Sequence, residues 1–139
     1  MSLPEYDLER FVAAQNRVWA DVQGELKAGE KRSHWMWFVF PQIAGLGMSA
    51  MSRAYAISGR EEALAYVAHS VLGPRLLDCV RLVLDLCGRT AEQIFGPVDA
   101  AKFRSCLTLF GQVFPAPEFI EALARFYGGV ADQATLARL

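Results

Sequence analysis

Apolar residues recur along most of the chain at spacings of three and four, which puts their side chains on one face of an α-helix. The first such segment lies between Asp7 and Gly29. Its apolar positions are Leu8, Phe11, Val12, Val18, Trp19, Val22 and Leu26. Asp7 suits a helix N-cap, and Gly29 is typical of the position just past a helix end. The pattern therefore predicts one amphipathic helix between these two residues.

Further helices are marked by start signals. A capping box, in which Ser or Thr precedes Glu or Gln by three residues, is present at Ser58–Glu61 and at Thr90–Gln93. Prolines suited to the first turn of a helix stand at Pro74 and Pro117. These signals predict four helices, each of which ends at a histidine or a glycine.

Two more helices are expected to begin near Asp99 and Asp132. No segment alternates between apolar and polar residues as a half-buried strand does, and hairpin signals are absent. The predicted fold is therefore all-α. We expect a compact, irregular, multihelical single domain over residues 1–139, with about seven or eight helices.

The sequence WMWFVF, Trp35 to Phe40, is apolar at every position. Six residues are too few to cross a bilayer, and a lone strand would leave its backbone groups unpaired. A helical segment that is apolar on all sides should be buried. Pro41 disfavours helical geometry at Phe40, so the segment should end there. We expect a buried plug at 35–40, followed by a turn at 41–47.

Composition narrows the function classes. The chain has 139 residues, 53% of them hydrophobic, and a net charge of -1. A protein that binds nucleic acid generally needs an excess of basic residues, which this chain lacks. We therefore expect no nucleic-acid partner, and a DNA-binding helical protein is the weakest of three hypotheses.

The cysteines and the N-terminus indicate the compartment. The chain has three cysteines, with no metal-binding spacing among them, and their apolar neighbours predict buried, reduced thiols. The N-terminal sequence MSLPEYDLER lacks the apolar core of a signal peptide, and no run is long enough for a membrane span. We expect a cytoplasmic protein with no metal ion, no cofactor and no membrane contact.

No motif identifies a catalytic group. The chain has two histidines, and no serine lies in a nucleophile-elbow pattern. His69 lies near a helix end, where a capping role explains it. His34 borders the aromatic run, and there a polar boundary residue is the alternative to a ligand contact.

Polar residues beside the distinctive segments are the candidate binding residues. Ser49, Ser52 and Tyr55 follow one another at helical spacing, as do Lys102 and Ser105. Close helix packing and ordinary hydrogen bonds to the backbone are the structural alternatives for these positions. The complete predicted ligand-binding set is His34, Trp37, Gln42, Ser49, Ser52, Tyr55, Lys102 and Ser105.

Several strings together resemble one family. They are HWMWFVFPQIAGLGMSAMSRAYAIS, EALAYVAHSVLGPRLLDCV, IFGPVDAAKFRSCLTLF and FYGGVADQATL, and they extend in order from about Leu8 to Leu136. The chain resembles the bacterial domain-of-unknown-function family 1810. The resemblance implies a mainly helical single domain and no established activity. The chain departs from the family pattern at Ser105–Cys106, where two adjacent serines are expected.

Two hypotheses from different classes remain. The first is a pocket for a small ligand, with a nucleotide-like molecule as the specific suggestion, because bases stack on aromatic rings and Gln reads their hydrogen-bonding edges. The second is an interaction or homodimerisation module without catalysis, in which part of the apolar excess lies in an interface. The sequence identifies neither the ligand nor a reaction.

Overall fold

The computed structural model describes residues 6–139 and confirms the all-α prediction. Within these residues the chain forms nine helices. Their bounds are α1 Glu9–Ala28, α2 Met36–Val39, α3 Ala50–Ala54, α4 Arg60–Ala68, α5 Leu72–Leu84, α6 Ala91–Phe95, α7 Pro97–Val113, α8 Pro117–Tyr127 and α9 Gln133–Leu136. The number exceeds the expected seven or eight because α2 and α3, of four and five residues, both form in addition to the seven helices whose starts the sequence marks.

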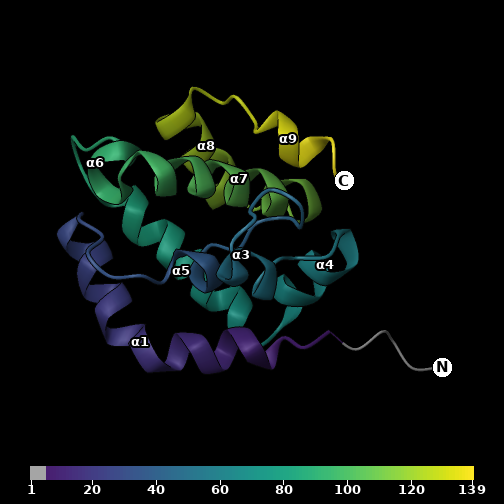
Figure 1. Cartoon of the computed structure of the whole chain (residues 1–139). Helices are drawn as coiled ribbons and strands as arrows, with labels where there is room; N and C mark the ends of the chain where they lie inside the picture. The colour runs from purple at the N-terminus through teal and green to yellow at the C-terminus, as the bar shows by residue number, and fades with distance from the viewer. Residues whose placement is uncertain (1–5) are drawn as a thin grey trace.

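The two helices α5 and α7 form the centre of the domain. Helix α7 packs against α4, α6, α8 and α9, while α5 packs against α1, α4 and α8. In Figure 1, α1 runs along one side of the molecule and α8 and α9 lie on the other. This arrangement is the irregular multihelical domain that the short helical segments predicted.

The plug at 35–40 is buried as expected. Trp35, Phe38 and Phe40 are at most 6% exposed. The Phe40 ring packs against Phe103, with ring centroids 4.9 Å apart, which ties the short helix α2 to α7. Helix α2 ends at Val39, in agreement with the effect expected of the following proline. Trp37 is the one residue of the run that remains partly exposed.

The buried side-chain amide of Gln15 forms a hydrogen bond with the backbone of α2. Gln15 is 1% exposed, and its Nε2 donates to the Phe38 carbonyl oxygen at 2.7 Å and to the Tyr66 hydroxyl at 3.1 Å. Its Oε1 accepts from Arg75 at 3.3 Å. Because a buried carbonyl without a partner is costly, this polar network lets a short helix end inside the core.

The predicted starts of the helices are confirmed in part. Thr90 and Gln93 form the predicted capping box, and the Asp132 side chain caps α9. Asp7 does not cap α1, which has Leu8 at its N-cap. Ser58 does not cap α4 either. The Ser58 backbone amide instead donates to Oε1 of the buried Glu62 carboxylate, at a distance of 2.7 Å.

The three thiols are not all buried as expected. Cys79 and Cys106 are buried free thiols, but Cys87 is exposed, so the prediction of three buried thiols was wrong at that position. Cys87 lies beyond Leu84, the last residue of α5, so it does not belong to the buried face of that helix. The signal-peptide expectation rests partly on residues 1–5, which lie outside the described residues. Among the remainder, no helix is long and apolar enough to cross a bilayer.

Candidate functional site

A hollow of about 450 Å³ opens on the first half of α7. The turn after α2 closes it on one side, and the ends of α8 and α9 close it on another. Its polar and aromatic lining residues are Gln42, Glu92, Lys102, Arg104, Ser105, Tyr127 and Asp132. A smaller hollow adjoins it and shares Gln42 and Gly47. The predicted residues Trp37, Ser52 and Tyr55 line this second hollow.

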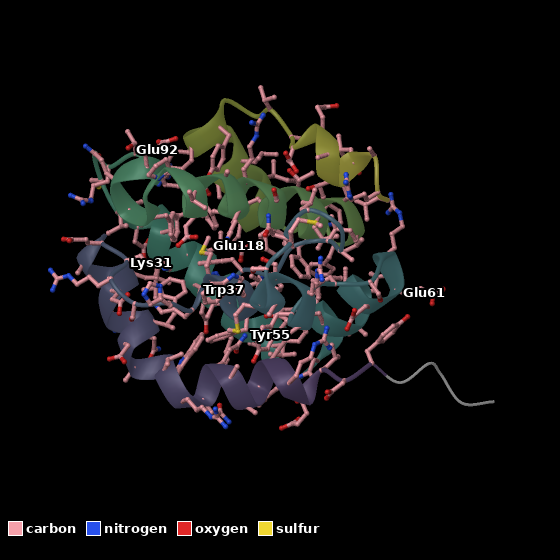
Figure 2. The ribbon with its side chains drawn as sticks, in the orientation of Figure 1. Lys31, Trp37, Tyr55, Glu61, Glu92 and Glu118 are labelled. Carbon is pink, nitrogen blue, oxygen red and sulfur yellow. The ribbon has the colours of Figure 1, made fainter. Side chains whose placement is uncertain are left out.

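The structure thus brings together six of the eight predicted binding residues. Lys102, Ser105 and Gln42 line the larger hollow, and Gln42 lies on both. Figure 2 labels Trp37 and Tyr55 of the smaller hollow and Glu92 of the larger one. Ser49 and His34 line neither hollow.

Ser49 has a structural task. Its hydroxyl accepts from the amide of Ser52 at 3.1 Å and caps α3, and the two hydroxyls lie 2.9 Å apart. Gly47 passes close to the same place, because a Cβ there would lie 2.4 Å from the Ser52 Oγ. The glycine-rich turn therefore packs directly against the start of α3.

His34 is exposed, and the segment around it is held by another residue. The Glu25 carboxylate accepts from the amides of Arg32 and Ser33, at 2.7 and 2.9 Å, and from the Ser33 hydroxyl. It also accepts from the Trp35 indole nitrogen at 3.0 Å. The role of His34 as a ligand contact stays a prediction without a pocket around it.

His69 also has a structural role, although not the one expected. Its Nδ1 accepts from the amides of Val71 and Leu72, at 3.1 and 3.3 Å. The imidazole thus caps the start of α5 instead of meeting the carbonyl groups at the end of α4.

Ser105 is 5% exposed and connects α7 to α9. Its Oγ lies 3.2 Å from the Ala101 carbonyl oxygen and 3.1 Å from Asp132 Oδ2. The first contact is the ordinary backbone bond of a helical serine, and the second reaches across to the cap of α9. A hydroxyl in this position helps to shape the wall of the larger hollow.

Asp132 was not among the predicted binding residues. Its Oδ2 accepts from the Thr135 amide at 3.1 Å and from the Thr135 hydroxyl at 2.5 Å. Its own amide donates to Thr108 on α7 at 2.9 Å. The sequence predicted Asp132 as a helix cap, but nothing in its spacing indicates that the capped helix packs against Ser105 and Thr108.

Tyr127 and Arg104, which no pattern in the sequence singles out, complete the wall. The Tyr127 hydroxyl donates to the Ala100 carbonyl oxygen, and the Arg104 guanidinium lies 5.9 Å from the ring centroid. Arg104 donates to the carbonyl oxygens of Val130 and Ala131, at 2.8 and 3.3 Å. Burial is the main cause that raises the Tyr127 pKa above its usual range, so this hydroxyl stays protonated.

The aromatic face of the smaller hollow is already in contact with a cation. The Lys102 Nζ lies 5.3 Å from the centroid of the Trp37 ring, at the distance of a cation–π interaction. Tyr55 packs against Phe11 and Phe38, with centroids 5.7 and 5.3 Å apart. Lys102 therefore links the two hollows, since it lines one and covers the aromatic wall of the other.

The Tyr55 segment is held in place from α1. The Arg10 guanidinium donates to the carbonyl oxygens of Ala54 and Ala56, both at 2.9 Å. It also forms an ion pair with the buried Glu62 at 3.1 Å. Because each of these contacts joins residues far apart in the chain, the wall formed by Tyr55 is fixed by the fold.

Within residues 6–139, no three His, Cys, Asp or Glu side chains are grouped as a metal site would require. The hollow instead combines two cations, two carboxylates, an amide and hydroxyl groups around a partly buried tyrosine. Such a lining can hold a polar ligand through hydrogen bonds and charge.

The comparisons with known proteins identify the family. Residues 5–139 match the model of the protein family of unknown function DUF1810. The chain belongs to this family, in agreement with the resemblance that the sequence strings indicated. Among solved structures, it is similar to the conserved hypothetical protein Rv1873 from Mycobacterium tuberculosis. The two are 51% identical, with a TM-score of 0.95 and 96% of each chain covered. None of the curated proteins matches it.

Proposed function

We propose that this protein binds a small, polar, nucleotide-like molecule in the larger hollow. The observation that carries the proposal is the meeting of Gln42, Lys102 and Ser105 on one hollow, although the turn and α7 are far apart in the chain. The volume of about 450 Å³ lies in the range of small-molecule sites, roughly 300–1,000 Å³.

The chemistry of the lining supports a ligand with several polar groups. The amide of Gln42 offers a donor and an acceptor, as recognition of a base edge requires. Tyr127 provides an aromatic wall within the larger hollow. Trp37 lies on the adjoining smaller hollow, and a ligand ring can stack on the face that Lys102 covers only if the lysine side chain moves aside.

The proposal is tested by the thermal stability of the purified protein with AMP, ADP and NAD. A ligand that binds only the native state stabilises it by about 2.7 kcal/mol at a free concentration of 100 times Kd. We expect at least one of the three to raise Tm. Trp37→Ala and Gln42→Ala should weaken the rise.

The control is Gln23→Ala, which removes an amide from α1, a helix that contributes no residue to either hollow. This variant should keep the full rise in Tm. The absence of any rise with the three compounds contradicts the nucleotide-like ligand.

A second candidate function is an interaction module that forms a homodimer. Phe114, Ile120 and Val130 are 44%, 57% and 53% exposed, and they lie on α8 or beside its ends. Light scattering at micromolar concentration distinguishes the two functions. A dimer that Ile120→Glu converts to a monomer supports the module, and a monomeric native protein counts against it.

The proposed compartment is the cytoplasm. The three free thiols support this placement, because reduced cysteines persist in a reducing compartment.

A further inference from the structure

Two lysines share one carboxylate beside the larger hollow. The Lys31 Nζ lies 2.8 Å from Asp99 Oδ2, and its side chain is 7% exposed. The same ammonium lies 5.2 Å from the centroid of the Trp35 ring. A charge buried to this degree requires a close partner, so the Asp99 charge is committed to Lys31. Figure 2 labels Lys31.

Lys102 interacts with the Asp99 carboxylate more weakly than Lys31 does. Its Nζ lies 3.7 Å from Asp99 Oδ1, which is longer than a hydrogen bond. Its other contact is the Trp37 ring, which carries no net charge. One negative charge thus faces two positive charges, and the excess positive charge falls on the lysine that lines the hollow.

Neither of the two carboxylates on the lining, Asp132 and Glu92, forms an ion pair with Lys102. Asp132 Oδ2 accepts three hydrogen bonds, from Ser105 and from both the amide and the hydroxyl of Thr135. Glu92 is exposed on α6. Among the described residues, the only carboxylate that forms an ion pair with Lys102 is that of Asp99.

We propose that the Lys102 end of the larger hollow is an oxyanion subsite, which takes a phosphate or carboxylate group. The ammonium supplies the charge, and the Gln42 amide, which lines the same hollow, supplies a neutral N–H donor. The subsite rests on this arrangement of charges. Its place in a nucleotide-like ligand, as the seat of the phosphate, rests on the function proposed above.

The subsite can be tested without the natural ligand, because Trp37 reports on its surroundings. Iodide is an anionic quencher of tryptophan fluorescence and caesium is a cationic one. Lys102 should draw iodide toward the Trp37 ring, and Lys102→Gln should lower the iodide quenching constant by about twofold while raising that of caesium. Trp35 is fully buried and Trp19 is unchanged by the substitution, so the difference reports on Trp37.

Two matched variants control for the charge and for the fold. Lys102→Arg keeps a cation in place and should keep the preference for iodide. Lys27→Gln removes the same charge from the exposed end of α1 and should leave both quenching constants unchanged. Inorganic phosphate should compete with iodide in the wild-type protein and not in Lys102→Gln. Equal quenching by iodide in the wild-type and Lys102→Gln proteins overturns the subsite.

A second arm compares AMP with adenosine, which differ by the phosphate group. If the phosphate lies at Lys102, AMP should bind about tenfold more tightly than adenosine, and Lys102→Gln should remove the difference. Equal affinity for both compounds overturns the placement of the phosphate. Failure of both to bind, together with no rise in Tm with ADP or NAD, contradicts the proposed function, while the quenching result alone decides the oxyanion subsite. Carboxylate and phosphate are distinguished by repeating the competition with acetate.

Discussion

The carboxylate of Glu25 organises the segment that leads into the aromatic run. Burial favours its protonated form, but hydrogen bonds from the Ser33 hydroxyl, the Ser33 and Arg32 amides and the Trp35 indole outweigh burial. Together they lower the Glu25 pKa to about 2 from its usual 4.5. Since the pKa in the folded state is the lower one, ionised Glu25 stabilises the native protein above pH 4.5. That contribution disappears as the pH falls toward 2.

We therefore predict that Glu25→Gln flattens the pH dependence of stability in this window. Urea denaturation between pH 5 and about 2.5 measures the effect, with the wild-type protein losing free energy of unfolding that the variant has already lost. Glu9→Gln is a matched control, because Glu9 is exposed on the same helix. A wild-type slope in Glu25→Gln would contradict the role assigned to this carboxylate.

Local spacing predicted two of the α7 side chains that line the hollow, missed Arg104 on the same helix, and predicted none from α8 or α9. Lys102 and Ser105 share a face because of helical spacing, which the sequence displays directly. Asp132 and Tyr127 reach the same hollow only because α8 and α9 pack back onto α7. Such packing depends on tertiary contacts, and no local spacing contains it.

Two glycines test the packing of helices. A Cβ on Gly73 would lie 2.0 Å from the carbonyl oxygen of Val67, where the end of α4 meets α5. Gly24, inside α1, has no heavy atom within 4 Å of its added Cβ. We predict that Gly73→Ala destabilises the protein by about 3 kcal/mol or more, because backbone must move.

Gly24→Ala should instead stabilise by about 0.5–1 kcal/mol, because alanine is the better helix former. Chemical denaturation of the two variants gives both values. A neutral Gly73→Ala would show that the α4–α5 connection is not tightly packed.

At the level of elements, the pattern of apolar residues predicted the helices but not all of their starts. Helix α4 begins after Gly59 because Glu62, three residues into the helix, binds both the Ser58 amide and Arg10. The capping box expected from Ser58 and Glu61 gives way to this more distant ion pair. A local signal was overruled by a contact with α1, which local sequence does not encode.

The whole molecule should expose one thiol and conceal two. Burial raises the Cys79 pKa to about 12, and it also raises the Cys106 pKa well above its usual value. Cys87 is exposed. We predict that a disulfide reagent such as DTNB labels one thiol rapidly in the native protein and three in denaturant.

The slow labelling of the other two thiols should follow global unfolding, since both lie in the core. Cys87→Ser should abolish the rapid phase and leave the slow one. Rapid reaction of two thiols in the native protein would indicate that the core opens locally.

At the scale of the molecule, the fold class followed from composition and helical periodicity, because both are properties of the chain itself. The hollow did not follow, because it forms where the turn after α2 meets α7, α8 and α9. The resemblance to the family added the expectation of a single helical domain, which the family match and the similar structure confirm.

The contact between Ile43 and Ile57 holds together the two ends of the segment that contains α3. A parallel β-bridge joins these buried residues, with the Ala44 amide donating to the Ile57 carbonyl oxygen at 2.8 Å and the Ile57 amide donating to that of Gln42 at 2.9 Å. Residues 44–56, which include α3 and carry Ser52 and Tyr55, therefore leave the core and return to it at one closed point. The exposed positions of a segment with fixed ends can vary in sequence while the core stays intact, whereas Tyr55 is held by Phe11 and Phe38. Mutations at these exposed positions should therefore change this part of the surface over evolution and leave the inherited fold intact.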